Sequence, residues 1–262
     1  MKNEIGFEER KQIQLEMLEE IDEFCRTHHI RYMLAFGTLL GAIRHKGFIP
    51  WDDDVDLCMP LEDMMRFKKE FKSNKLKYCD VDTEPYYNYP FSRIAYLPTY
   101  SRMGRKFRSY GINIDLYPLV EISNSDDVVC KQIRKAKILM FIRKLFTRIR
   151  GLIISVFPIK TIPFYHQSCV AYRDFMLNKI RTDGGGRFLI VAGKLSLFFR
   201  HVFSFNPFDE LIDVDFEKQK FRGPARYDEF LTTRYGDYMQ LPPENERVPY
   251  HGGHYYWKED IH

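Results

Sequence analysis

The segment Trp51-Asp52-Asp53-Asp54-Val55-Asp56-Leu57 constrains the fold most strongly, because it places four aspartates within five positions. Carboxylates repel one another, so a folded chain gathers them only beside water, a cation or a cationic side chain. The segment continues into an alternation of apolar Val55, Leu57 and Met59 with other residues, and this period of two predicts a half-buried strand. The fold must therefore hold an acidic cluster where a core strand begins.

Short apolar strands and amphipathic helices alternate around this segment. The patterns predict helices over 8–29, from Thr38 onward, after Pro60 and over 225–235, and strands over 32–36, 55–59 and several stretches between 77 and 118. Strands interspersed with helices indicate an α/β (α+β) domain.

The character of the chain changes after Ser125, because no acidic residue lies between Asp127 and Asp174. Apolar residues recur there at steps of three or four, at Ile138, Ile142, Leu145, Ile149, Leu152 and Val156. Helices are also predicted over 163–182 and 188–205. We therefore expect a mostly helical, basic insertion over 126–210. It would separate a catalytic core of 1–125 from a C-terminal segment of 211–262 that completes the core. The stretch 131–150, with eight Lys or Arg, is either a solvated helix packed on the core or a helix at an anionic membrane surface.

Composition excludes several classes of protein. Apolar residues make up 45% of the chain and charged residues 29%, which suits a folded domain rather than a disordered chain. The five cysteines are scattered without a C-x-x-C pair, so a zinc site or a disulfide framework is not expected and a reducing compartment is. No signal peptide or spanning segment is predicted, which favours a cytoplasmic location, with attachment to the inner face of the cell membrane left open. A pI near 8.6 argues against a dedicated nucleic-acid binder.

Three features point to metal and phosphate chemistry. On a strand, Asp54 and Asp56 would project from the same face, and paired carboxylates suit Mg²⁺. Asp115 lies in a second strand-like run, GINIDLYPL, whose alternation could aim it at the same cation. Gly37-Thr38 joins an apolar strand to a helix, where a phosphate can approach the backbone. A solvated acidic loop and a simple strand-to-helix turn are the plain alternatives.

The order of these features resembles the nucleotidyltransferase-fold superfamily, in which such carboxylates hold divalent metal beside nucleotide phosphates. The longer runs AFGTLLGAIRHKGFIPWDDDVDLCMP, GINIDLYPL and RYGDYMQLPP resemble the LicD family, bacterial relatives of the fukutin-type ribitol-phosphate transferases. The resemblance implies a nucleotidyltransferase-like core with a mixed sheet flanked by helices.

The resemblance also implies an activity. It is a metal-dependent phosphotransferase that moves an alcohol phosphate, phosphocholine first of all, from CDP-choline or another CDP-alcohol, with CMP leaving. The acceptor would be a sugar hydroxyl of a cell-surface glycan, a lipid-linked glycan, a lipopolysaccharide or a teichoic-acid precursor. Two alternatives stay open: nucleotidyl transfer to a sugar or small molecule, and a non-catalytic scaffold at the membrane surface.

Residue roles follow from the same resemblance. Asp54 and Asp56 would be ligands of Mg²⁺, or of Mn²⁺, which carboxylates suit equally well, and Asp115 a third ligand or the base for the acceptor hydroxyl. Asp52 and Asp53 would support these ligands, or meet a quaternary ammonium together with Trp51.

The neighbouring residues would bind phosphate. Gly37 and Thr38 would cradle it, and the basic triplet Arg44, His45 and Lys46 would meet its charge. We expect four further basic residues mostly at the solvated surface, with a phosphate-binding wall as the alternative: Arg93, Arg102, Arg105 and Lys106. The distal turn at Tyr235 is either a structural closing segment or an acceptor contact.

Overall fold

The computed structural model describes residues 4–84, 87–103, 107–156, 163–182, 184–192, 200–249 and 253–258. The chain forms two compact units. The first comprises Met1–Tyr78, Arg93–Leu116 and Pro207–His262, and the second comprises Cys79–Ser92 and Tyr117–Asn206. Whether the ranges 1–125, 126–210 and 211–262 act as domains stays a prediction.

The first unit is built around the strand that follows the aspartates. Strand β3 (Asp56–Pro60) lies between β2 (Met33–Leu34) and β8 (Asn113–Ile122), and it runs antiparallel to β2 with Leu57 opposite Leu34. All five residues of β3 are buried, so both of its faces are covered rather than the one that alternation predicts.

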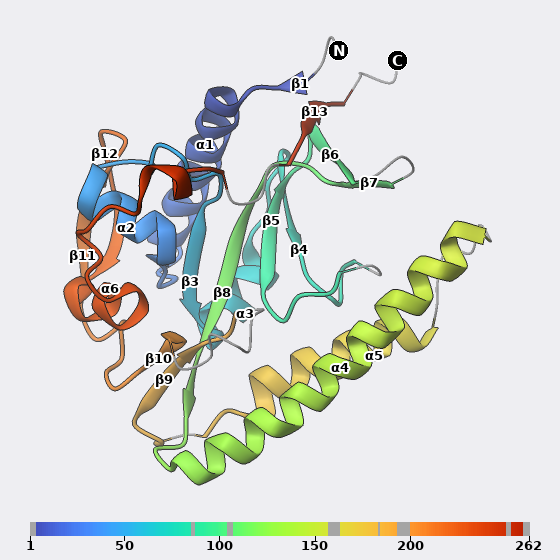
Figure 1. Ribbon diagram of the computed structural model, residues 1–262. Coiled ribbons are helices and arrows are strands. Elements are labelled where there is room, and N and C mark those ends of the chain that lie inside the picture. Colours follow the sequence, from blue (N-terminus) through green and yellow to red (C-terminus); the bar gives the residue numbers. More distant parts are fainter. Residues whose placement is uncertain are drawn as a thin grey trace. The chain divides into compact units, whose positions relative to one another are not determined.

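Seven strands form the main sheet. Beside β2, β3 and β8 it contains β4 (Leu76–Cys79), β5 (Ser92–Tyr96), β9 (Arg187–Ile190) and β10 (Val202–Phe203). The order is β10-β9-β8-β3-β2, and β5 pairs with both β4 and β8. Figure 1 shows β8 as a long strand, whose residues 113–116 belong to the first unit and 117–122 to the second. The predicted α/β (α+β) class is confirmed.

Two smaller sheets complete the first unit. One has the order β1-β13-β6-β7, from β1 (Glu4–Ile5), β13 (Tyr255–Trp257), β6 (Thr99–Met103) and β7 (Phe107–Tyr110). The other is a hairpin of β11 (Leu211–Phe216) and β12 (Gln219–Pro224), with Glu217 and Lys218 at positive φ in its turn. A 3-10 turn at Glu244–Glu246 follows later in the chain.

The helices predicted for the first unit are confirmed, with small shifts at their ends. They are α1 (Phe7–Thr27), α2 (Phe36–His45), α3 (Leu61–Glu70) and α6 (Tyr227–Tyr235). Helix α2 begins two residues earlier than predicted, so Gly37 and Thr38 lie in its first turn. Pro60 is the N-cap residue of α3.

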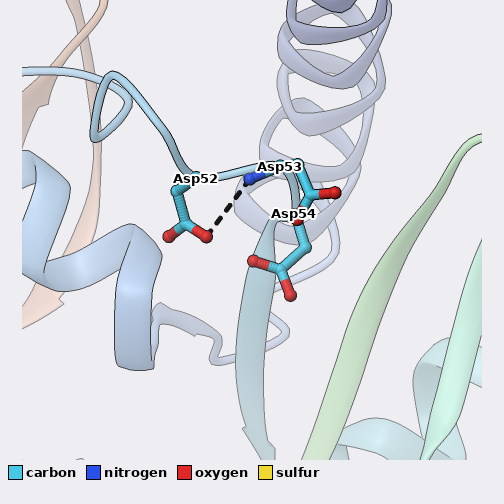
Figure 2. Close-up of side chains that lie close together, drawn as sticks. All are labelled: Asp52, Asp53 and Asp54. Carbon is cyan, nitrogen blue, oxygen red and sulfur yellow. Dashed lines mark hydrogen bonds between the residues drawn. The ribbon is translucent and has the colours of Figure 1, made fainter. Parts of the chain in front are cut away.

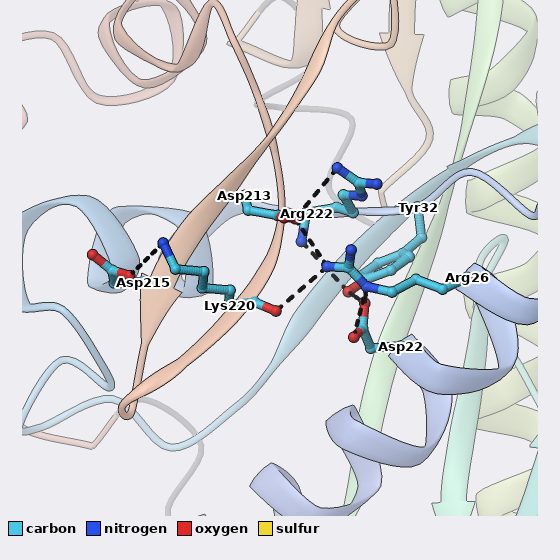
Figure 3. Close-up of polar contacts among 7 residues, drawn as sticks. All are labelled: Asp22, Arg26, Tyr32, Asp213, Asp215, Lys220 and Arg222. Carbon is cyan, nitrogen blue, oxygen red and sulfur yellow. Dashed lines mark hydrogen bonds and ion pairs between the residues drawn. The ribbon is translucent and has the colours of Figure 1, made fainter.

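A polar network joins α1 to the hairpin (Figure 3). Arg26 Nε donates to both oxygens of Asp22, at 2.7 and 2.9 Å, and Arg26 Nη2 donates to Asp213 at 2.9 Å. The hydroxyl of Tyr32 donates to Asp22 as well. The network fixes the hairpin against the first helix.

The second unit contains α4 (Asp126–Val156), α5 (Pro163–Asp174) and a π-helical turn at Phe175–Lys179. The helix predicted over 188–205 is wrong for the part that the structure describes, because β9 pairs antiparallel with Leu119–Ile122 of β8, and β10 pairs with β9. Pairing with a distant strand overrides local preference here. Residues 193–199 of that prediction lie outside the described part of the chain.

Helix α4 buries one apolar side and exposes another. Its buried residues include Val129, Ile133 and Ala136, whereas the predicted apolar stripe is exposed: Ile138 by 60%, Ile142 by 37% and Leu145 by 46%. These three residues of the stripe therefore do not pack in the core. Among the described helices, none is both long and apolar enough to cross a bilayer.

Candidate active site

Three consecutive aspartates lie in the loop that leads into β3 (Figure 2). Asp52, Asp53 and Asp54 each offer a carboxylate oxygen, and these oxygens lie within 4.8 Å of one another. The amide of Asp53 donates to Asp52 Oδ1 at 3.2 Å, which holds the loop in a tight turn. Such a set of oxygen donors suits a hard divalent cation.

Asp53 has a structural partner. Its carboxylate is 1% exposed and accepts a hydrogen bond from Arg10 Nη1 at 3.2 Å. The Arg10 guanidinium carbon lies 4.5 Å from the centroid of the Tyr255 ring. This buried ion pair ties α1 to the acidic loop and compensates one of the four negative charges; contact of Asp53 with a substrate stays a prediction.

Thr38 and Asp56 connect α2 to β3. The backbone N–H of Asp56 donates to Thr38 Oγ1 at 2.8 Å, and both residues are buried. Asp56 is the first residue of β3, while Asp54 precedes the strand, so the two do not share one regular strand as the alternation suggested. The hydroxyl of Thr38 fixes the start of the strand that carries Asp56.

Gly37 allows an acidic side chain to reach the first turn of α2. A Cβ atom at Gly37 would lie 2.5 Å from Asp52 Oδ2, closer than real contacts allow. The N-terminal turn of a helix favours negative charge, and here the carboxylate of Asp52 lies against it. The place that the sequence predicts for a phosphate is thus adjacent to Asp52.

Asp115 lies beside the acidic segment in the sheet. Its backbone N–H donates to the carbonyl of Val55 at 2.9 Å. Its carboxylate accepts from Arg93 Nε at 2.6 Å and Nη2 at 3.2 Å, and from Asn113 Nδ2 at 2.9 Å. The expectation that Arg93 is solvated surface is therefore wrong, because pairing of β5 with β8 joins it to Asp115. Arg105, Lys106 and the side chain of Arg102 lie outside the described part of the chain.

Tyr235, at the end of α6, belongs to the same neighbourhood. Desolvation raises the pKa of its hydroxyl well above the ordinary value, and the negative charges of Asp56, Asp52 and Asp54 raise it further, against the opposing charge of Arg234. The hydroxyl therefore stays protonated at neutral pH and can donate a hydrogen bond. The distal motif RYGDY was the sequence signal, but it could not show that its tyrosine approaches the aspartates.

The three residues of the basic triplet at the end of α2 have different surroundings. Arg44 Nη1 donates to the carbonyl of Tyr238 at 2.7 Å, and Arg44 Nε donates to His45 Nε2 at 3.0 Å. Burial and the charge of Arg44 lower the pKa of His45, so this imidazole is neutral at pH 7 and adds no positive charge. Lys46 is exposed in the left-handed conformation that caps α2. Arg44 thus anchors the distal segment, and Lys46 is the exposed cation of the triplet.

Trp51 lies between a histidine and an arginine. Its ring meets His45 edge to face at 6.0 Å between centroids, and the Arg247 guanidinium carbon lies 5.6 Å from its centroid. Arg247 Nε also donates to the carbonyl of Pro242 at 2.9 Å. No sequence pattern pointed to Arg247. A cation already stacks on Trp51, while contact with a substrate ammonium stays a prediction.

Comparison with known proteins adds a family match. The family described as "LicD/FKTN/FKRP, nucleotidyltransferase domain" matches residues 29–174, which include the acidic loop, β3 and Asp115. The lipopolysaccharide cholinephosphotransferase LicD of Haemophilus influenzae is 26% identical over 266 residues, covering 93% of this chain and 95% of that protein.

Two further matches are short. The ribitol 5-phosphate transferase FKRP of mouse and that of human are each 60% identical to this chain over 35 residues, which is 13% of this chain and 7% of those proteins. A high identity confined to a short stretch indicates a shared local motif rather than a shared whole protein.

Proposed function

The chain belongs to the LicD/FKTN/FKRP family of nucleotidyltransferase domains, and on that premise we propose that it transfers an alcohol phosphate from a CDP-alcohol to a sugar hydroxyl of a glycan. The family is one of transferases, so the chain is an enzyme. The relative that aligns along nearly the whole chain is named for phosphocholine transfer in lipopolysaccharide, and the shorter matches for ribitol phosphate transfer. Phosphocholine is the proposed cargo, with CDP-choline as donor. A lipopolysaccharide or teichoic-acid precursor is the proposed acceptor.

One observation carries the proposal. Asp52, Asp53 and Asp54 bring carboxylate oxygens within 4.8 Å of one another, and Asp115 is joined to this segment through the backbone of Val55. This clustering of carboxylates on the loop before β3, beside the strand that carries Asp115, supports the proposal. Such a place can bind a cation and a diphosphate together.

The donor atoms fit a divalent cation. The grouped carboxylates offer oxygen only, and Arg10 compensates the charge of Asp53. We propose Asp54 and Asp56 as the ligands, with Mg²⁺ or Mn²⁺ as the ion. A bound divalent cation would neutralise charge that develops on the diphosphate.

The surrounding residues orient these carboxylates. Arg93 and Asn113 hold the Asp115 carboxylate in one orientation, which suits a third ligand; a role as base would require these contacts to open. Gly37 and Thr38 would bind phosphate at the first turn of α2, once the charge of Asp52 there is compensated. Lys46 would meet the phosphate from the exposed side.

The proposed reaction forms one bond to phosphorus and breaks another. The acceptor hydroxyl oxygen forms a bond to the distal phosphorus of the donor, and the bond from that phosphorus to the bridging oxygen breaks. CMP leaves with the bridging oxygen, and the hydroxyl proton passes to Asp115 or to solvent. Positioning of the hydroxyl opposite the leaving oxygen is the main requirement on the protein.

The proposed location is the cytoplasm. None of the five cysteines, all of which the structure describes, is in a disulfide, and four of them are buried. This state of the cysteines is the one that a reducing compartment maintains.

The test is to incubate the pure protein with a panel of CDP-alcohols and Mg²⁺, with and without a glycan acceptor, and to measure CMP. We expect CMP from at least one CDP-alcohol, faster with an acceptor and absent after chelation. No CMP from any donor would contradict the proposal. A second candidate, nucleotidyl transfer, is favoured by the family description itself; it predicts pyrophosphate from a nucleoside triphosphate instead.

A further inference from the structure

Helix α4 is apolar on two opposite sides. The inner side buries Val129, Ile133 and Ala136, each at most 7% exposed. On the other side, exposed apolar residues recur at the i, i+3, i+4 and i+7 spacing of a single helix face: Ile138 60%, Phe141 68%, Ile142 37% and Leu145 46%. These four residues are called the outer face of α4 below. An ordinary surface helix has a single apolar side, which packs against the protein, so the second apolar side of α4 is unusual.

Helix α5 adds to the exposed apolar surface. Figure 1 shows α5 beside α4, and Phe164 of α5 stacks on Phe146 of α4 with 6.1 Å between ring centroids. Phe164 is itself 68% exposed. Exposed apolar residues scattered singly are ordinary, but a contiguous group of this kind marks an interaction surface.

A basic flank borders the outer face. Lys137, Lys144 and Arg148 follow at i, i+7 and i+11, so they lie along one side of the helix, and all three are exposed. No acidic residue occurs in the sequence between Asp127 and Asp174. The surface therefore combines apolar side chains with positive charge only.

From this combination we propose that the outer face of α4 docks on an anionic lipid surface, with its apolar side chains in the acyl boundary and Lys137, Lys144 and Arg148 at the headgroups. An interfacial helix has this arrangement of one apolar face and a cationic border. A second copy of the chain fits poorly, because two such faces would bring like charges together. The docking is interfacial, since α4 also packs its inner side against protein.

Binding is tested with vesicles of phosphatidylcholine alone and of phosphatidylcholine mixed with phosphatidylglycerol. The full chain is expected to sediment with the mixed vesicles, and added salt should release it. Equal binding to both kinds of vesicle, or to neither, would overturn the proposal. The assay contains neither donor nor acceptor, so its outcome is independent of the proposed enzymatic function.

Two sets of variants separate charge from insertion. The triple variant Lys137→Gln, Lys144→Gln, Arg148→Gln should weaken partitioning roughly tenfold or more. Its matched control removes the same charge from exposed lysines elsewhere, Lys69→Gln, Lys72→Gln, Lys75→Gln, and should bind like the natural chain. Likewise Phe141→Gln with Leu145→Gln should lose binding, whereas Met65→Gln, at a residue 65% exposed on α3, should not. Equal loss in a variant and its control would reject the assignment.

A direct readout of depth keeps the proposal testable if a variant folds poorly. Phe141→Trp introduces an indole on the outer face while keeping it apolar. Its emission, measured against the natural chain, should be quenched by lipids brominated on the acyl chains. No quenching would overturn the proposal, as would a stable dimer that Phe141→Gln converts to a monomer, since a second copy would then cover the face.

Discussion

At the scale of single residues, the aspartates of the acidic loop have different partners although three of their carboxylates lie close together. Asp53 turns toward Arg10 and is buried, while Asp52, Asp54 and Asp56 share an influence on Tyr235. The sequence predicted that the acidic run matters, but it treated Asp52 and Asp53 alike because their partners lie far away in the chain.

The ligand assignment predicts the behaviour of Asp54→Ala and Asp56→Ala. Each should abolish CMP release, because a cation site that loses a carboxylate binds its ion much more weakly. Each should also fold, since relief of repulsion among clustered carboxylates offsets the lost contacts. Mg²⁺ should raise the thermal unfolding temperature of the natural chain and not that of the variants.

The control for these variants is Asp215→Ala, which removes an exposed carboxylate paired with Lys220 on the hairpin. This variant should keep both its activity and the increase in thermal unfolding temperature that Mg²⁺ causes. Most of the activity surviving in Asp54→Ala or Asp56→Ala would show that these residues are not the ligands.

Tyr235→Phe tests the hydroxyl beside the carboxylates. This hydroxyl is protonated at neutral pH, as that of an ordinary tyrosine is, and we propose that it donates a hydrogen bond to the charged substrate. Such a bond contributes about 1.5–3 kcal/mol, so kcat/KM for the donor should fall at least roughly tenfold. Tyr227→Phe, at the other end of α6, is the matched control and should leave kcat/KM unchanged. Equal values for both variants would remove Tyr235 from the site.

At the scale of elements, helix α2 makes close contacts that two of its glycines allow. A Cβ atom at Gly37 meets the flexible carboxylate of Asp52, whereas one at Gly41 lies 2.5 Å from the backbone carbonyl oxygen of Gly47. Gly37→Ala should therefore keep the fold, helped by the higher helix propensity of alanine, but lose activity as Asp52 moves. Gly41→Ala should lower the free energy of unfolding by about 1–3 kcal/mol. Urea unfolding and CMP release measure the two effects, and the reverse pattern would contradict this reading.

The hairpin network makes a prediction about pH. Burial acts to raise the pKa of Asp213, but its hydrogen bond to Arg26 and the charges of Arg26, Arg222 and Lys220 outweigh burial and lower it (Figure 3). A lowered folded-state pKa stabilises the protein above the unfolded value of about 3.9, and that stabilisation is lost as pH falls through the folded pKa.

Asp213→Asn should consequently lower the free energy of unfolding at pH 7, by less than about 1 kcal/mol because the pair is partly exposed. The difference from the natural chain should shrink in acid and vanish once both states are protonated. Urea midpoints at several pH values measure it, and a difference that persisted in strong acid would contradict the ionic origin.

Among the helices and strands, some follow from local sequence patterns and others do not. Helices α1, α2, α3 and α6 follow from apolar periodicity, which is written in neighbouring residues. Strand β9 was missed because its partner in β8 lies about 70 residues away. Periodicity predicts an apolar face in α4 but does not say whether that face is buried. Pairing and burial are properties of the folded chain.

For the whole molecule, charge is divided between the two units. The acidic site lies in the first unit, and the basic flank of α4 lies in the second. This division was predictable, because charge patterns are local in sequence. The ion pairs Arg10–Asp53 and Arg93–Asp115 and the approach of Tyr235 were not, since they join residues that only the fold brings together.

The central claim concerns which phosphorus of the donor is attacked. Slow hydrolysis of CDP-choline by the enzyme in ¹⁸O-water decides it without any acceptor, when both products are analysed by mass spectrometry and Asp56→Ala serves as the blank. Attack at the distal phosphorus predicts ¹⁸O in phosphocholine and unlabelled CMP. Label in CMP, with unlabelled phosphocholine, would contradict alcohol-phosphate transfer and indicate nucleotidyl transfer.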